Sequence, residues 1–269
     1  MSTISGFATV NGTRLYYELA GAGPTLVLIH GFSIDTRMWD DQMDMLTPHF
    51  QVLRYDMRGF GRSALPDDRP YDPCVDLCEL MDSLDIKQAG IMGLSLGGWV
   101  AVDFAIAYPE RVTSLIAADA AIMGYEWKEG RPSVQPAEVA QSQGIEQAKQ
   151  FWMGSPLFEA ARRHPRVLRR LDEMVSDYSG WHWVNENPQI LADEPAIYHL
   201  KDIACPCLVV VGEHDVYDFQ EIAKILAAEI PDAHHAIIAD AGHMSNMENP
   251  KQFNAVLEEF LMSSTSESV

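Results

Sequence analysis

The chain has 269 residues, of which 47% are hydrophobic, and its formal net charge is -20 at pH 7. This length fits one large domain or one domain with an insertion, and the hydrophobic fraction excludes disorder over most of the chain. A surface this acidic repels phosphate backbones and anionic lipids, so we expect neither a nucleic-acid partner nor a membrane partner.

The first part of the chain alternates predicted strands with predicted helices. Residues 7–10 and 15–19 flank Asn11-Gly12, a dipeptide that favours a tight turn, and they predict a hairpin. The continuous apolar run at 25–29 predicts a strand that is covered on both faces. The spacing of apolar residues then predicts helix 39–46, strand 51–55, helix 75–84, strand 89–92, helix 96–108 and strand 112–117.

The same alternation returns near the end of the chain. The predicted elements there are strand 207–211, helix 219–229, strand 236–238 and helix 252–262. Strands that alternate with helices predict an α/β fold with a mostly parallel, doubly wound sheet and helices on both faces.

The interval 121–200 interrupts this pattern. It contains no convincing strand, and its clearest predicted helices are 137–152 and 167–178. We therefore predict a core made of residues 1–120 and 201–269, with a helical cap inserted at 121–200. The cap is rich in aromatic residues, most of which are expected to fill the interior of the cap itself.

The strongest chemical signal is Gly93-Leu94-Ser95-Leu96-Gly97, which follows a short predicted strand and opens a predicted helix. A nucleophile on such a tight turn points outward, and only small residues tolerate the crowding beside it. The amino end of the helix adds partial positive charge where an oxyanion would form. We predict Ser95 as a nucleophile.

A serine hydroxyl needs a base, and His243 has the best position among nine histidines. It lies in a turn between the last predicted strand and the last predicted helix. His30, in contrast, is expected to shape the backbone of its own loop. We predict His243 as the base that accepts the proton of Ser95.

The base needs a carboxylate to orient its ring, and three acidic residues are candidates. Asp215 follows the strand at 207–211, Glu213 lies two residues before it, and Asp119 follows the strand at 112–117. All three lie at the carboxyl edge of the predicted sheet. We favour Asp215, because the chain order Ser–Asp–His recurs in folds that place a nucleophile on this type of turn.

Two backbone amides could stabilise the oxyanion. One is the N–H of Leu96, directly after the nucleophile, and the other is the N–H of Phe32, in the loop after the strand at 25–29.

The four cysteines, in contrast, do not predict a metal site, because Cys74 and Cys78 have no second ligand pair and Cys205-Pro206-Cys207 is not the usual redox spacing. We expect free thiols, no metal and no cofactor. The start Met1-Ser2-Thr3-Ile4 does not resemble a secretion signal, so we expect a cytoplasmic location.

Four landmarks make the chain resemble the α/β-hydrolase superfamily over nearly its whole length. They are His30-Gly31-Phe32, the stretch 56–63, Gly93-Leu94-Ser95-Leu96-Gly97-Gly98, and Gly212-Glu213-His214-Asp215 with Gly242-His243. The chain most resembles small cytosolic carboxylesterases and lactonases, including 3-oxoadipate enol-lactonases. The resemblance implies a Ser–His–Asp hydrolase with a helical cap.

The residues beside the catalytic turns and in the cap predict a mostly apolar pocket for a small ester or lactone. The predicted lining residues, besides Phe32 and Leu96, are Ile122, Met123, Trp152, Trp181, Trp183, Val216 and Met244.

Other activities stay open. The chain could be a small-molecule receptor with a vestigial triad, a peroxide-dependent perhydrolase, or a C–C bond hydrolase. Leu94 makes the last less favoured, because that group often has Asn before its nucleophile. A methyl esterase that recognises an acyl carrier protein through a basic cap also stays open, since the cap contains several arginines.

Overall fold

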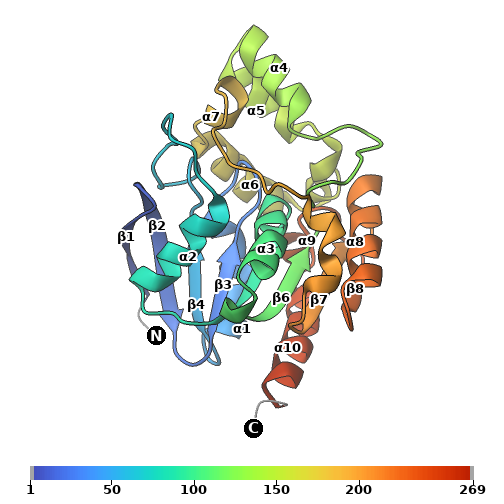
Figure 1. Cartoon of the computed structure of the whole chain (residues 1–269). Helices are drawn as coiled ribbons and strands as arrows, with labels where there is room; N and C mark the ends of the chain where they lie inside the picture. The colour runs from blue at the N-terminus through green and yellow to red at the C-terminus, as the bar shows by residue number, and fades with distance from the viewer. Residues whose placement is uncertain (1–2, 267–269) are drawn as a thin grey trace.

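An eight-stranded sheet forms the centre of the molecule in this computed structural model, which describes residues 3–266 (Figure 1). The strands lie in the order β1-β2-β4-β3-β5-β6-β7-β8. Their bounds are β1 Ile4–Val10, β2 Thr13–Gly21, β3 Thr25–Ile29, β4 Gln51–Tyr55, β5 Ala89–Leu94, β6 Val112–Ala118, β7 Cys207–Gly212 and β8 His234–Ile238.

The sheet is mostly parallel, as the sequence predicts. In the described part of the chain, β1 with β2 and β2 with β4 pair in antiparallel fashion, and the other five pairings are parallel. The antiparallel hairpin forms around Asn11 and Gly12, whose φ angles of 43° and 68° are those that this tight turn requires. The carboxyl ends of β3 to β8 therefore meet at one edge of the sheet.

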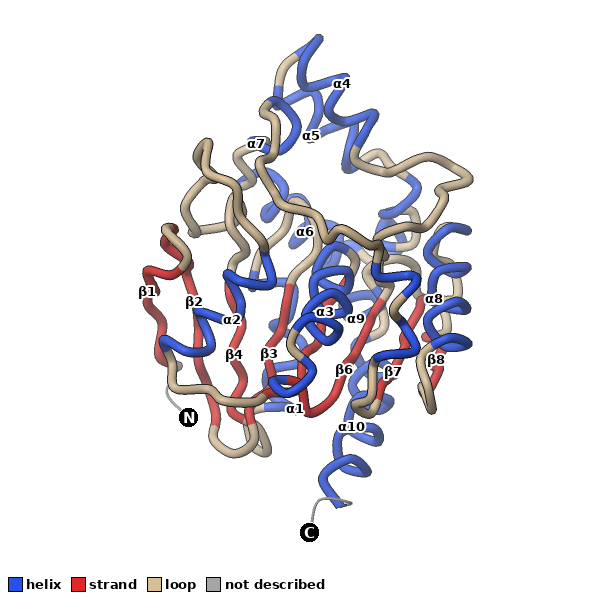
Figure 2. Tube along the Cα trace, in the orientation of Figure 1, coloured by secondary structure: helices blue, strands red, loops and turns tan. Residues whose placement is uncertain are grey.

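Helices cover the sheet (Figure 2): α2 and α3 lie in front of it in this view, whereas α1 lies behind it and packs against α10. The helices of the sheet layers are α1 Asp40–Leu46, α2 Pro73–Ser83, α3 Leu96–Ala107, α8 Tyr217–Glu229, α9 Ser245–Glu248 and α10 Pro250–Ser266. Each predicted helix of the core is confirmed, and α9 is a short helix that the sequence pattern does not predict.

Four helices lie together above the carboxyl edge of the strands (Figure 1). They are α4 Val134–Gln143, α5 Ile145–Met153, α6 Pro165–Asp177 and α7 Trp181–Val184. They occupy the interval predicted as an inserted cap, and the boundaries 121 and 200 stay a prediction.

The prediction of one continuous helix over 137–152 is wrong. The segment forms α4 and α5, and the break lies at Gly144, whose φ of 93° is left-handed. Glycine adopts this conformation without a steric penalty, and it commonly ends helices for that reason. The apolar periodicity continues across Gly144, so periodicity alone misses the break.

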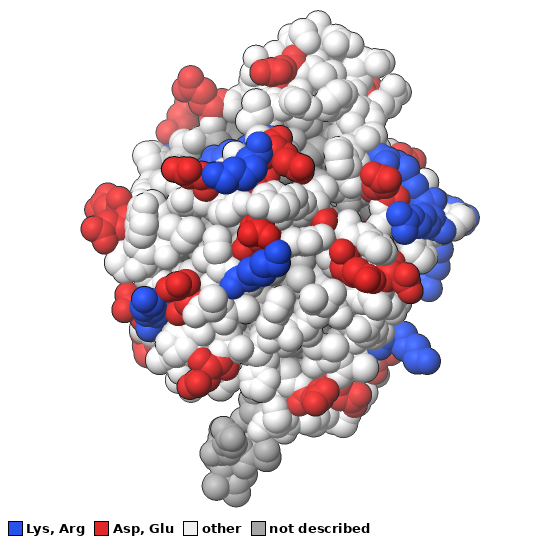
Figure 3. Space-filling view, turned by 90° about the vertical axis from the view of Figure 1, so that its right-hand side faces the viewer, with Lys and Arg blue, Asp and Glu red and all other residues white. Residues whose placement is uncertain are grey.

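Two properties of the whole molecule agree with its composition. Acidic side chains are spread over the face shown in Figure 3, in keeping with the net charge of -20. Within residues 3–266, no helix combines the length and the apolar character that a bilayer span requires.

Candidate active site

Ser95 lies on a strained turn between β5 and α3. Its φ of 57° and ψ of -114° are unusual for a non-glycine residue, and its amide donates to the carbonyl of Ala118 at 3.0 Å. The neighbouring glycines are required by close packing. A Cβ on Gly93 would lie 2.0 Å from the carbonyl oxygen of Gly97, and a Cβ on Gly97 would lie 2.2 Å from that of Ile29.

His243 and Asp215 form a buried pair at the same edge of the sheet. The Nδ1 atom of His243 lies 2.9 Å from Oδ2 and 3.1 Å from Oδ1 of Asp215. The two residues are 3% and 5% exposed. Asp215 also accepts a hydrogen bond from the amide of Val216 at 2.7 Å, which fixes the orientation of the carboxylate. This arrangement makes Nδ1 a donor and leaves Nε2 of His243 available as an acceptor.

The two rival carboxylates have other partners. Asp119 is fully buried; its Oδ1 accepts from the amide of Gly212 at 2.8 Å and its Oδ2 from the hydroxyl of Ser245 at 2.5 Å. Burial, followed by the nearby carboxylate of Asp215, raises the pKa of Asp119 well above its ordinary value. Glu213 is exposed and accepts from the amide of Asp240. Asp119 therefore ties together the loops that carry Asp215 and His243.

Ser95 and His243 share one neighbour, Phe219. The ring of Phe219 packs against the ring of His243, with centroids 4.2 Å apart, and Phe219 lines the same cavity as Ser95. Within the described part of the chain, no hydrogen bond joins the hydroxyl of Ser95 to His243. Such bonds are often long before substrate binds. The roles of nucleophile, base and orienting acid stay predictions.

The loop that contains Phe32 approaches Ser95. A Cβ on Gly31 would lie 3.6 Å from Cβ of Ser95. His30 shapes this loop, as predicted: Nε2 accepts from the amide of Met57 at 2.9 Å, and Nδ1 lies 2.7 Å from the carbonyl of Gly31. Among residues 3–266, the amides of Phe32 and Leu96 have no hydrogen-bond acceptor, so both donors are available to a ligand.

A cavity of about 120 Å³ contains Ser95. Five of the predicted pocket and oxyanion residues line it, namely Phe32, Leu96, Ile122, Met123 and Trp152. It adjoins a larger cleft of about 600 Å³ between the sheet layers and the cap helices, with which it shares Phe32, Leu96, Trp99, Arg131 and Ser133. We call the smaller space the catalytic cavity.

Four predicted pocket residues are not part of this lining. Trp183 is buried and packs on Phe32 and Trp152, with ring centroids 6.0 Å and 6.4 Å away. Trp181 packs on His182, Met244 is buried, and Val216 precedes the first turn of α8.

Sequence reasoning missed several lining residues, among them Trp99, Trp127, Arg131, Leu157 and Phe219. Two of them had a recognisable signal. Trp99 lies four residues after Ser95, and Phe219 lies four residues after Asp215, so each is about one helical turn beyond a predicted catalytic residue.

Known proteins resemble this chain in both sequence and fold. The model of the alpha/beta hydrolase family matches residues 26–256. A 3-oxoadipate enol-lactonase of Acinetobacter baylyi is 28% identical, over 93% of this chain and 94% of that protein. A pimeloyl-[acyl-carrier protein] methyl ester esterase of Photobacterium profundum is also 28% identical, over 93% of this chain and 99% of that protein.

A solved structure agrees closely with the fold. The enol-lactonase of Burkholderia xenovorans superimposes with a TM-score of 0.82 and 30% identity, over 96% of this chain and all of that one. The resemblance found in the sequence motifs is thereby confirmed. The chain belongs to the alpha/beta hydrolase family.

Proposed function

We propose that the protein is a serine hydrolase that cleaves carboxylic esters or lactones of small, partly hydrophobic substrates through an acyl-enzyme. The observation that carries the proposal is the strained turn of Ser95 in the catalytic cavity, combined with the buried His243–Asp215 pair at the same sheet edge. The similarity to a lactonase and to a methyl ester esterase supports the same reaction class.

The proposed route has two halves. Ser95 attacks the carbonyl carbon while Nε2 of His243 accepts the hydroxyl proton, and the amides of Phe32 and Leu96 stabilise the oxyanion. The alcohol leaves with the proton from His243. Water, activated by His243, then hydrolyses the acyl-enzyme and regenerates Ser95. No step of this route uses a metal or an organic cofactor.

The lining of the catalytic cavity supports a substrate with an apolar group beside the reacting carbonyl. Ile122, Met123, Trp127, Leu157 and Phe219 surround the space near Ser95. The cavity is small, and the adjoining cleft gives room for the remaining part of the substrate. The cytoplasmic location stays a prediction.

The test is hydrolysis of p-nitrophenyl esters and simple lactones by the wild type and by Ser95→Ala. We expect rapid turnover that Ser95→Ala abolishes, whereas Ser142→Ala, an exposed serine on α4, keeps it. A fluorophosphonate should label the wild type on a single serine, identified as Ser95 by peptide mass spectrometry.

Other outcomes would favour other functions. Turnover that survives in Ser95→Ala would contradict the acyl-enzyme route. An inactive wild type that a small molecule strongly stabilises would favour a receptor with a vestigial triad. Peroxide-dependent halide oxidation would favour a perhydrolase.

A further inference from the structure

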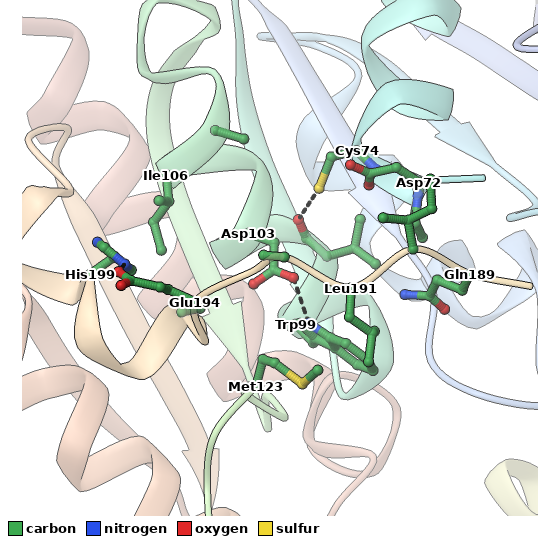
Figure 4. A pocket seen from close by; sticks show the side chains of 16 residues that line it. Asp72, Cys74, Trp99, Asp103, Ile106, Met123, Gln189, Leu191, Glu194 and His199 are labelled. Atoms are coloured by element: carbon green, nitrogen blue, oxygen red, sulfur yellow. Dashed lines mark hydrogen bonds and ion pairs between the residues drawn. The ribbon is translucent and has the colours of Figure 1, made fainter. Parts of the chain in front are cut away.

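Trp99 lies between the catalytic cavity and a second, partly open pocket. This side cavity has a volume of about 100 Å³ and is lined by residues that include Asp72, Asp103, Ile106, Leu191 and Glu194 (Figure 4). Trp99 and Met123 are the two residues that line both spaces. We call these two residues the wall between the two cavities.

The backbone of Trp99 is fixed relative to the nucleophile. Trp99 lies in the first turn of α3, and its amide donates to the carbonyl of Ser95 at 3.0 Å. Its indole also lines the cleft between the sheet layers and the cap helices. The side chain of Trp99 thus borders three spaces, and its backbone lies one helical turn from the backbone of Ser95.

Asp103 fixes the indole of Trp99. The Nε1 atom donates to Oδ2 of Asp103 at 2.6 Å, a bond between residues four apart on the same face of α3 (Figure 4). Burial raises the pKa of Asp103 to about 7, and the carboxylate of Asp72 adds to the effect. Among residues 3–266, no lysine or arginine lines the side cavity, so the indole is the partner of this poorly solvated carboxyl group.

We propose that Trp99, positioned by Asp103, limits the length of the apolar substrate group beside the reacting carbonyl by closing the side cavity to it. The inference rests on the proposed ester or lactone hydrolysis. Most of the side cavity wall is apolar, with Pro73, Val100, Ile106, Ala107 and Leu191 among its residues. A longer alkyl chain would fit there if the indole were absent.

The first experiment compares kcat/KM for p-nitrophenyl esters of increasing acyl length and for alkyl acetates of increasing alcohol length. We expect Trp99→Ala to raise the ratio of long-chain to short-chain kcat/KM in one series by about tenfold or more, the scale of pocket discrimination for one or two methylenes.

A second cavity residue serves as a matched control. Ile106→Ala enlarges the side cavity but leaves the wall in place, so the chain-length preference should stay at the wild-type value. In a Trp99→Ala background, the same Ile106→Ala change should move the preference to still longer chains. Equal effects in both backgrounds would overturn the proposal, because they would show that Trp99 does not separate the spaces.

The role of Asp103 is tested with variants that remove or keep the hydrogen-bond acceptor for the indole N–H of Trp99. Asp103→Leu and Trp99→Phe each remove the hydrogen bond, so both should broaden the preference toward longer chains. The double variant should add little to either single change. Asp103→Asn keeps an acceptor for the indole N–H and should retain the wild-type preference. A purely structural role would lower kcat equally for all chain lengths.

Failure of this inference is distinguishable from failure of the proposed function. Wild-type turnover of acetates and butyrates, lost in Ser95→Ala, establishes the hydrolase independently of Trp99. If that turnover is present and every Trp99 and Asp103 variant, shown to be folded by its thermal transition, keeps the wild-type length preference, the wall is not the determinant of length.

Discussion

The carboxylate of Glu248 holds the backbone on both sides of His243. Its Oε2 accepts from the amide of Gly242 at 2.5 Å, and its Oε1 accepts from the amide of Met244 at 3.3 Å. Glu248 is only 6% exposed, and burial raises its pKa. Glu248 therefore fixes the loop that presents the imidazole, without contacting the reacting atoms.

Removing this support should displace the imidazole. We expect Glu248→Ala to lower kcat for ester hydrolysis by about 10- to 100-fold, the effect of a small misplacement of a catalytic group, with a smaller change in KM. Glu248→Gln retains one acceptor and should recover part of the loss. Steady-state kinetics measure both, and Glu258→Ala, an exposed position on α10, is the control. Unchanged kcat in a folded Glu248→Ala variant would contradict the role.

The pairing of Asp215 with His243 predicts a much larger effect on the chemical step. Asp215→Asn allows the wrong histidine tautomer to be favoured, and we expect kcat to fall by about 10⁴-fold with the fold retained. Glu213→Gln should leave kcat near the wild-type value, because Glu213 contacts the amide of Asp240 and not the imidazole. The reverse result would assign the orienting role to Glu213.

The packing at the nucleophile turn predicts a loss of stability. Gly97→Ala puts a methyl group against the backbone of β3, so we expect the free energy of unfolding to fall by about 3 kcal/mol or more, at the upper end for overpacking. Gly130→Ala meets no atom within 4 Å and has only the cost of a left-handed residue, about 1–2 kcal/mol. Urea denaturation compares the two variants. Equal losses would show that crowding at Gly97 is relieved by backbone movement.

His182 predicts a dependence of stability on pH. It stacks on Phe60 with centroids 4.4 Å apart, and burial lowers its pKa from 6.5 to about 4. Between pH 6.5 and 4, His182 binds a proton more readily in the unfolded chain than in the native one. The stability that the neutral ring of His182 contributes is therefore fully present above pH 6.5. It is lost as the pH falls toward 4, by up to about 3 kcal/mol at roughly 1.4 kcal/mol per pKa unit.

His182→Phe removes this titration and should weaken the fall in stability between pH 7.5 and 5. Urea denaturation at the two pH values measures the difference. The exposed His49 gives a control variant, His49→Gln, in which the wild-type dependence should persist. An identical slope in His182→Phe and the wild type would mean that other groups account for the acid sensitivity.

Local signals in the sequence predicted most of the helices and strands, and the exceptions have separate physical causes. Asn11-Gly12 predicted the hairpin, because its turn geometry depends on those two residues alone. The prediction of one helix over 137–152 was wrong at Gly144, because the spacing of apolar residues carries no information on backbone dihedral angles. Trp183 was predicted as a pocket residue from its place in the cap; it is buried against Trp152 and Phe32, and its role in substrate binding stays a prediction.

The sequence by itself determined the strand–helix alternation and the motif around Ser95, and through chain order it placed Asp215 and His243 at one sheet edge. These depend on periodicity, turn chemistry and the parallel arrangement of strands, which are local or topological properties. Only the tertiary structure decided that Asp119 binds Gly212 and Ser245, that Asp215 pairs with His243, and that Trp99 lines two cavities. These outcomes depend on side-chain directions and distances between elements far apart in the chain, which no local pattern specifies.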